Sequence, residues 1–106
     1  MYRIIRKSIA IGHLEFSHRL IQGPLAGYSC APMRLMFADF VKPAYAVSEM
    51  LSAHDVLTKH ALNSRYLYRS PEEGKLCYQL AGSDPIELAE AAVKLTEIGA
   101  DLIDIN

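Results

Sequence analysis

The sequence predicts an α/β fold built on a parallel β-sheet. Apolar runs of strand length alternate with amphipathic stretches of helix length along most of the chain. Strand–helix–strand units at this spacing are typical of right-handed crossovers between parallel strands. The chain has 106 residues, of which 51% are apolar and 22% are charged, which is the profile of one globular domain.

The composition also excludes several classes of protein. Eleven basic and twelve acidic residues give a net charge of −1, which argues against a nucleic-acid clamp acting by itself. No apolar run approaches the ~20 residues needed to cross a bilayer. The basic N-terminus is followed by an apolar stretch too interrupted for a secretory signal. We therefore expect a cytoplasmic protein without membrane association.

Neither the cysteines nor the histidines form a metal-binding pattern. Cys30 and Cys77 make no metal-type pair and no disulfide framework, and are expected to be small buried hydrophobes. Neither has a cationic neighbour in sequence that would make it a nucleophile. The four histidines lack helical metal spacing and are expected on the surface or in loops: His13, His18, His54 and His60.

The N-terminal half contains a hairpin and a first strand–helix unit. Ser8–Phe16 alternates apolar and polar residues around a Gly-His pair, which predicts a β-hairpin. Arg19–Gln22 is a short strand candidate that runs into the glycine-flanked loop Gly23–Gly27. Pro32 suits the first turn of a helix that extends to Phe40. The Lys-Pro pair that follows ends this helix.

Two further strands are predicted before the last helix. Ala44–Ser48 is apolar enough for a buried strand, and Leu76–Leu80 is another. Between them, Ser52–Leu62 is weakly helical, Asn63–Ser70 shows no pattern, and Pro71–Gly74 is a turn.

The clearest local signal is a helix that begins after Asp84. Asp84 can cap it, Pro85 suits its first position, and Glu87 lies three residues after the cap in capping-box spacing. Gly99 is a natural stop, and Asp101–Ile105 alternates as a fourth parallel strand. One face of this helix is formed by Leu88, Ala92, Leu95 and Gly99. The opposite face is charged and is formed by Glu87, Glu90, Lys94 and Glu97.

Active sites of parallel α/β folds lie at the C-terminal ends of the strands. This rule selects four places: Gly23–Gly27, Ser48–Met50, Gln79 with Gly82, and Asp104–Asn106. The loop could bring backbone close to a flat ligand, or could simply be a tight turn. It matches neither a Walker loop nor a Gly-x-Gly-x-x-Gly fingerprint.

The polar residues at these places have two interpretations each. Gln79, on a strand expected to be buried on both faces, needs a partner, which could be a ligand ring or a neighbouring loop. Glu49 is either solvated or functional. Asp104 and Asn106 share one face of their strand, which could point inward or into solvent.

Four blocks of the sequence resemble the N-terminal part of bacterial, B-type tRNA-dihydrouridine synthases. The blocks are Leu20–Gly27, Val47–Met50, Tyr78–Pro85 and Gly99–Asn106, and they occur in the same order and at the same spacing. The resemblance covers the chain from about Gly12 onward. It implies that residues 1–106 are a partial FMN-binding catalytic domain. This domain would be the first four or so strands of a TIM (β/α)₈ barrel, preceded by a β-hairpin.

The resemblance also implies a chemistry. These enzymes reduce the 5,6 double bond of uridines in tRNA, with FMN as cofactor and NADPH as reductant; a hydride reaches C6 and an acid protonates C5. Pro24, Leu25 and Ala26 match the loop that contacts the flavin, and Gln79 matches the glutamine that hydrogen-bonds the flavin ring. Asn106 matches the asparagine that contacts the target base.

Three departures from the family pattern qualify these implications. Leu25 replaces the usual methionine, a swap of similar volume. Ser29-Cys30 replaces Thr-Asp, which leaves the following helix cap open. The general-acid cysteine of the family lies just beyond the position of Asn106. The flavin-phosphate site and the helical tRNA-binding domain lie further on. We therefore expect a piece without a catalytic cysteine that is inactive alone and meets tRNA through the full-length protein.

Two other functions compete with this one. Another FMN barrel, such as a dihydroorotate dehydrogenase-like or old-yellow-type reductase, would share the fold, but Gly82–Pro85 and the Asp-Ile-Asn ending favour the tRNA enzyme. A non-catalytic α/β interaction module complete at this length would unfold cooperatively as a monomer. Half a barrel would instead expose strand edges and self-associate.

Overall fold

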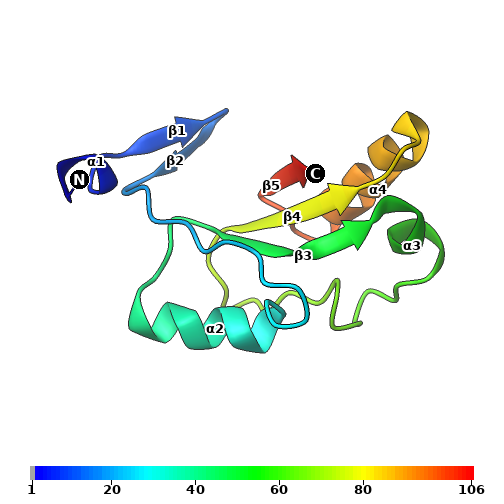
Figure 1. Cartoon of the computed structure of the whole chain (residues 1–106), viewed down its shortest axis with the longest axis horizontal. Helices are drawn as coiled ribbons and strands as arrows, with labels where there is room; N and C mark the ends of the chain where they lie inside the picture. The colour runs from blue at the N-terminus through cyan, green and yellow to red at the C-terminus, as the bar shows by residue number, and fades with distance from the viewer. Residues whose placement is uncertain (1) are drawn as a thin grey trace.

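The computed structural model describes residues 2–106, in which a three-stranded sheet lies among helices and a separate hairpin (Figure 1). The elements in chain order are α1 (Tyr2–Ile5), β1 (Ile9–Ile11), β2 (Leu14–Phe16), α2 (Ala31–Phe40), β3 (Ala46–Ser52), α3 (Ala53–Thr58), β4 (Leu76–Ala81), α4 (Pro85–Glu97) and β5 (Leu102–Ile105). None of these helices is long and apolar enough to span a membrane.

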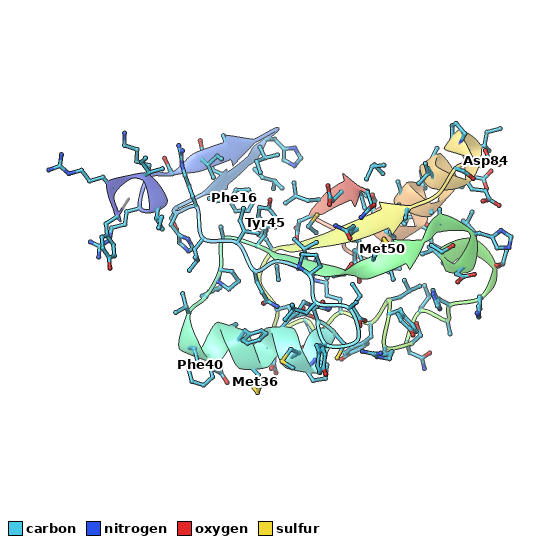
Figure 2. All side chains as sticks on the ribbon, viewed as in Figure 1. Phe16, Met36, Phe40, Tyr45, Met50 and Asp84 are labelled. Atoms are coloured by element: carbon cyan, nitrogen blue, oxygen red, sulfur yellow. The ribbon has the colours of Figure 1, made fainter. Side chains whose placement is uncertain are left out.

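The main sheet is parallel, in the order β3-β4-β5, and α4 connects its last two strands. This confirms the predicted α/β class with parallel strands. The hairpin β1-β2 is also confirmed, with Ile9 opposite Phe16. Phe16 is buried against Tyr45, with ring centroids 5.4 Å apart, so the hairpin is attached beside the start of β3 (Figure 2).

The predicted strand Arg19–Gln22 is wrong in extent. Only a single parallel bridge joins Gln22 to Ala46, in which the Gln22 N–H donates to the Tyr45 carbonyl at 3.1 Å. Pro24 follows two residues later without an N–H, so it has no donor for a continued ladder. The four-stranded sheet expected from the sequence is therefore three strands and one bridge in the described chain.

Strand β3 runs four residues further than predicted, to Ser52, and contains a bulge between Val47 and Met50. Ser48 and Glu49 together stand opposite the single residue Tyr78, which falls between the registered partners Cys77 and Gln79. The Ser48 hydroxyl accepts the Gln79 N–H at 3.2 Å where the ladder is interrupted. Residues 48–50 thus lie inside the strand rather than after it.

The core lies between one face of the sheet and helices α3 and α4. Leu76, Tyr78 and Leu80 alternate along β4 and are fully buried. They pack with residues of β3, of both helices and of the connection between α3 and β4: Leu51, Val56, Leu67, Ala91 and Leu95. A Cβ at Gly82 would lie 3.3 Å from the Ala53 Cβ, so a glycine here allows the close approach of α3.

Helix α4 forms as predicted, but its capping box does not. The Asp84 carboxylate accepts the Ile86 N–H at 2.9 Å and caps the helix. The Glu87 carboxylate lies 2.9 Å from His54 Nδ1 on α3 instead of returning to the cap. The hydrogen bond to Glu87 raises the pKa of His54, which is exposed as predicted.

Other predicted boundaries are also corrected. The weak helix Ser52–Leu62 shrinks to α3, since Ser52 caps it through the Asp55 N–H and its last turn ends at Thr58. Asp101 precedes β5 instead of starting it, because its carboxylate accepts the Leu76 N–H at 2.9 Å and pairs with Arg69 at 3.2 Å. The short helix α1 was not predicted from the sequence.

Candidate functional site

One face of the sheet points away from the core and carries polar side chains near the strand ends. Strand alternation and register place Met50, Gln79 and Asp104 side by side on it, since Gln79 pairs with both of the others. The Asn106 N–H donates to the Leu80 carbonyl at 2.7 Å, which continues the ladder of β5. Alternation then places Asn106 on the same face. We call Met50, Gln79, Asp104 and Asn106 the strand-end face.

Gln79 is the best-defined polar group of this face. Its Nε2 donates to Asp104 Oδ2 at 2.9 Å. A carboxylate only accepts, so this bond fixes the amide with Oε1 turned away from Asp104. Gln79 is half-buried, which corrects the expectation of a strand buried on both faces. Its partner is a neighbouring strand and not a loop, and Oε1 has no hydrogen-bond partner among residues 2–106.

The loop Gly23–Gly27 has a defined shape although its central residues Pro24, Leu25 and Ala26 are exposed. The Leu25 N–H donates to Ser29 Oγ at 2.9 Å, and this hydroxyl donates back to the Leu25 carbonyl at 3.0 Å. Gly27 has a φ of +80°, a conformation that favours glycine. Ser29 therefore holds the loop, whereas Cys30 makes no side-chain cap for α2.

A buried carboxylate joins this loop to the sheet. Glu49, which the sequence left either solvated or functional, is only 6% exposed and pairs with Arg65 at 3.2 Å. Arg65 Nη2 also donates to the Gly27 carbonyl at 3.1 Å. Contact with Cys30, and then the charge of Glu49, raise the pKa of Arg65. The sequence did not identify Arg65, because it lies in a segment without periodicity.

The two cysteines differ in their surroundings, and both are free. Cys77 is buried as predicted, and burial, followed by the charge of Asp104, raises its pKa to about 11. This thiol stays protonated at neutral pH and is no nucleophile. Cys30 is only partly buried, which corrects its prediction, and its thiol lies 3.5 Å from the Tyr28 carbonyl.

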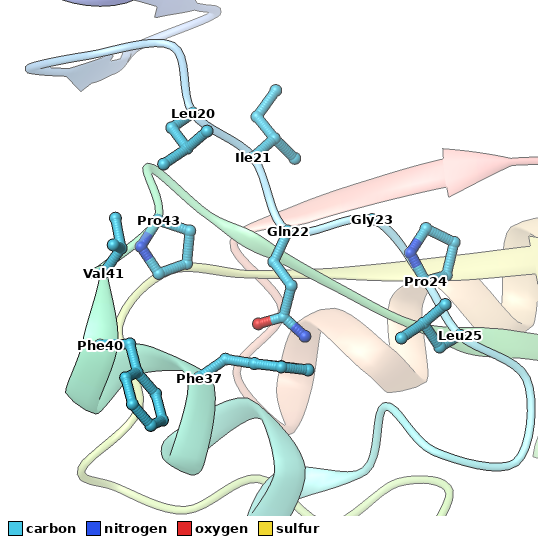
Figure 3. Close-up of a pocket in the computed structure, with 10 residues that line it drawn as sticks. All are labelled: Leu20, Ile21, Gln22, Gly23, Pro24, Leu25, Phe37, Phe40, Val41 and Pro43. Carbon is cyan, nitrogen blue, oxygen red and sulfur yellow. The ribbon is translucent and has the colours of Figure 1, made fainter.

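A cavity of about 500 Å³ lies elsewhere, between the segment 20–25 and helix α2 (Figure 3). Gln22 pairs with Ala46, and Ala46 pairs with Leu76 of the core, so the Gln22 side chain is on the core side of the sheet. Pro24 and Leu25 line this cavity, whereas Gln79 and Asn106 do not. The structure therefore brings Gln79 and Asp104 together, but does not enclose all predicted site residues in one cavity.

The strand-end face can bind one edge of a planar heterocycle. Met50 is 56% exposed and offers an apolar surface beside the Gln79 amide. The Gln79 Oε1 can accept a ring N–H, and the Asn106 amide can both donate and accept. An apolar surface with a few fixed polar groups is typical of cofactor sites, and these groups fit a flavin ring.

Comparison with known proteins identifies the family. The model of the family described as "Dihydrouridine synthase (Dus)" matches residues 21–106. The chain is 38% identical over 96 residues to tRNA-dihydrouridine synthase B of Vibrio cholerae, covering 91% of this chain and 30% of that protein. The same enzyme of Salmonella typhimurium and of Escherichia coli K12 is 35% identical over the same shares. The chain thus spans about 30% of the length of these relatives. With most of its residues matched, the chain belongs to the dihydrouridine synthase family.

Proposed function

We propose that the chain is the cofactor-contacting N-terminal part of a cytoplasmic tRNA-dihydrouridine synthase of B type. The proposed reaction is reduction of the uracil 5,6 double bond in tRNA, with FMN as cofactor and NADPH as reductant. The observation that carries this proposal is the Gln79 amide, oriented by Asp104 on an exposed face. The family match favours this enzyme over other flavin-dependent barrels and over a non-catalytic module. In the proposal, β3, β4, β5 and the bridge at Gln22 are the first strands of a TIM barrel.

The residues proposed to hold the flavin lie on two segments. Gln79 Oε1 would accept a ring N–H, Met50 would contact the apolar part of the ring, and Pro24, Leu25 and Ala26 would approach it from the loop. Asp104 acts on Gln79 by holding Nε2, which keeps Oε1 directed outward. When bound, FMN supplies the hydride for the reduction.

The substrate contact proposed for this chain is Asn106. Its exposed amide follows Asp104 by two residues on the same face and can donate to and accept from a uracil edge. Cys77 is not placed to supply the proton for C5, because its thiol is buried and does not face solvent. We therefore propose that these 106 residues do not complete the reaction by themselves.

Flavin titration tests the proposed site. FMN fluorescence is followed as the chain is added, for the wild type, Gln79→Met and the matched control Gln22→Met on the core side. We expect quenching with the wild type and the control. We expect about fivefold weaker binding for Gln79→Met, since one hydrogen bond is worth about 1 kcal/mol. Absence of quenching with the wild type, or equal affinity of Gln79→Met, contradicts the proposal.

A turnover assay tests the role of the 106 residues alone. The chain is incubated with an unmodified tRNA transcript, FMN and NADPH, and dihydrouridine is measured by mass spectrometry of the digested nucleosides. We expect no dihydrouridine above a control without protein. Multiple turnovers would show that a proton donor exists within these residues and would refute that part of the proposal.

A further inference from the structure

Three separate segments of the chain meet at the guanidinium of Arg65, which lies in the connection between α3 and β4. Its Nη2 donates to the carbonyl of Gly27 at 3.1 Å and to Glu49 Oε1 at 3.2 Å. The first partner ends the exposed loop, and the second lies in the bulge of β3. One side chain therefore connects the loop to the strand that carries Met50.

The partner carboxylate makes this contact a constrained one. The Glu49 side chain is 7% exposed, and Arg65 is its ion-pair partner within the described chain. A buried carboxylate without a counter-charge is costly, so Glu49 holds Arg65 in place. Arg65 itself is about half exposed, so solvent screens the ion pair. The pair therefore contributes little to the free energy of unfolding, and its main effect is to fix the position of Arg65.

Aromatic side chains support the guanidinium from the side. The Arg65 Cζ lies 5.2 Å from the ring centroid of Tyr66, within cation–π range. The Tyr66 ring in turn stacks on His60, with centroids 4.6 Å apart and an interplanar angle of 27°. These contacts restrict the rotamers of Arg65 and keep its donors directed at Gly27 and Glu49.

The loop is thus held at two points. Ser29 closes it at Leu25 through two hydrogen bonds, and Arg65 holds its end at Gly27. We propose that Arg65 is a positioning residue that, through Glu49 and Gly27, fixes the loop Gly23–Gly27 relative to the strand-end face so that both can contact one flavin. This inference rests on the proposed function for the identity of the ligand, but the anchoring itself is independent of it.

Lysine cannot replace arginine in this role. Both contacts come from Nη2, whose two N–H groups have fixed directions in the planar guanidinium, whereas the ammonium of lysine rotates freely at the end of a flexible stem. Arg65→Lys should therefore keep an ion pair with Glu49 while weakening the contact to Gly27. Arg65→Gln should lose both, and Glu49→Gln removes the charge that holds the arginine while keeping the size of the side chain.

Hydrogen exchange of the loop and flavin affinity together test the inference. Both are measured on the full chain for the wild type, Arg65→Gln, Arg65→Lys and Glu49→Gln. The matched control is Arg6→Gln, an exposed arginine for which the described structure gives no side-chain partner. For Arg65→Gln we expect about tenfold faster exchange in residues 23–30 and about tenfold weaker FMN binding. Each effect corresponds to the loss of one charge-assisted hydrogen bond. Exchange of β4 should stay unchanged, and Arg65→Lys should lie in between.

The possible outcomes separate this inference from the proposed function. Loop exchange in Arg65→Gln equal to that in the control overturns the anchoring. If Arg65→Gln does not fold, the same comparison with Glu49→Gln decides. A loosened loop with unchanged FMN affinity overturns the positioning role. A loosened loop in a chain whose wild type binds no FMN supports the anchoring and refutes the proposed cofactor.

Discussion

Arg34 belongs to α2 and is buried, at 4% exposure. Its guanidinium connects the helix to the residues before it and to the connection before β4. It donates to the Ser29 carbonyl at 2.8 Å, to the Tyr68 carbonyl at 3.2 Å, and to both oxygens of Glu73. Glu73 also accepts the Ser70 N–H at 2.8 Å. This pair holds the irregular connection before β4 against the helix.

Removing one partner of this pair should destabilise the chain strongly. Arg34→Met leaves the Glu73 carboxylate buried without its counter-charge, and we expect a loss of about 3–5 kcal/mol in the free energy of unfolding. Urea unfolding measures this loss. The double variant Arg34→Met/Glu73→Gln should recover part of it, because no charge is then stranded. A loss below about 1 kcal/mol for the single variant would show that the pair is solvated.

Cys77 should be chemically silent in the folded chain. With its pKa raised to about 11, the thiol keeps its proton at pH 8, whereas a thiol in the unfolded chain, with a pKa of about 8.5, is partly ionised. The folded chain therefore keeps this proton longer than the unfolded chain does. The contribution of Cys77 to stability is constant below about pH 8.5 and falls between there and pH 11. Iodoacetamide labelling at pH 8 should modify Cys30 first. Equal labelling of Cys77 without denaturant would contradict the burial.

The sequence could identify Gln79 but not Arg65 or Arg34. An amide within an apolar strand is conspicuous, because neighbouring residues give it no local partner. Arg65 and Arg34 find their partners 16 and 39 residues away, respectively. Periodicity and local spacing carry no information about contacts of that range.

Helix α4 shows how local signals are modified by neighbouring elements. Its cap and its apolar face follow from the sequence, since both depend on residues within one or two turns. Its capping box fails because α3 brings His54 within 2.9 Å of Glu87. Strand β3 was predicted too short for a related reason: its bulge interrupts the alternation on which strand boundaries are read.

The cap of α4 should contribute measurably to stability. Asp84→Ala removes the acceptor for the Ile86 N–H, and we expect a loss of about 1 kcal/mol. Denaturant unfolding measures it, with Glu87→Gln as the control that leaves the Asp84 cap intact. An Asp84→Ala variant as stable as the control would show that the cap does not stabilise the helix.

At the scale of the molecule, apolar side chains remain exposed on α2. Phe40 is 82% exposed, and with Met36 it lies on the side of the helix that points away from the sheet (Figure 2). Val41 continues this surface at the edge of the large cavity. Such patches are typical of surfaces that bind further protein. The parallel order of the sheet could be predicted from the sequence. The exposed apolar surface of α2 could not, because it depends on which side of the helix the rest of the chain covers.

This surface should cause self-association of the 106-residue chain. We expect a concentration-dependent sedimentation coefficient for the wild type, and a more monomeric Phe40→Lys variant, since the substitution places a charge in the patch. Tyr2→Lys is the matched control, because Tyr2 is also an exposed aromatic residue, at 80% exposure, but lies on α1 and outside the patch. A monomeric wild type at all concentrations would refute this expectation.

The most direct test of the proposed flavin site is NMR of the ¹⁵N-labelled chain during titration with FMN. The account predicts that the side-chain amides of Gln79 and Asn106 and the backbone amides of Gly23–Gly27 shift, while the amides of α2 do not. Shifts confined to the cavity beside Gln22 and Phe37, or no shifts, would contradict it.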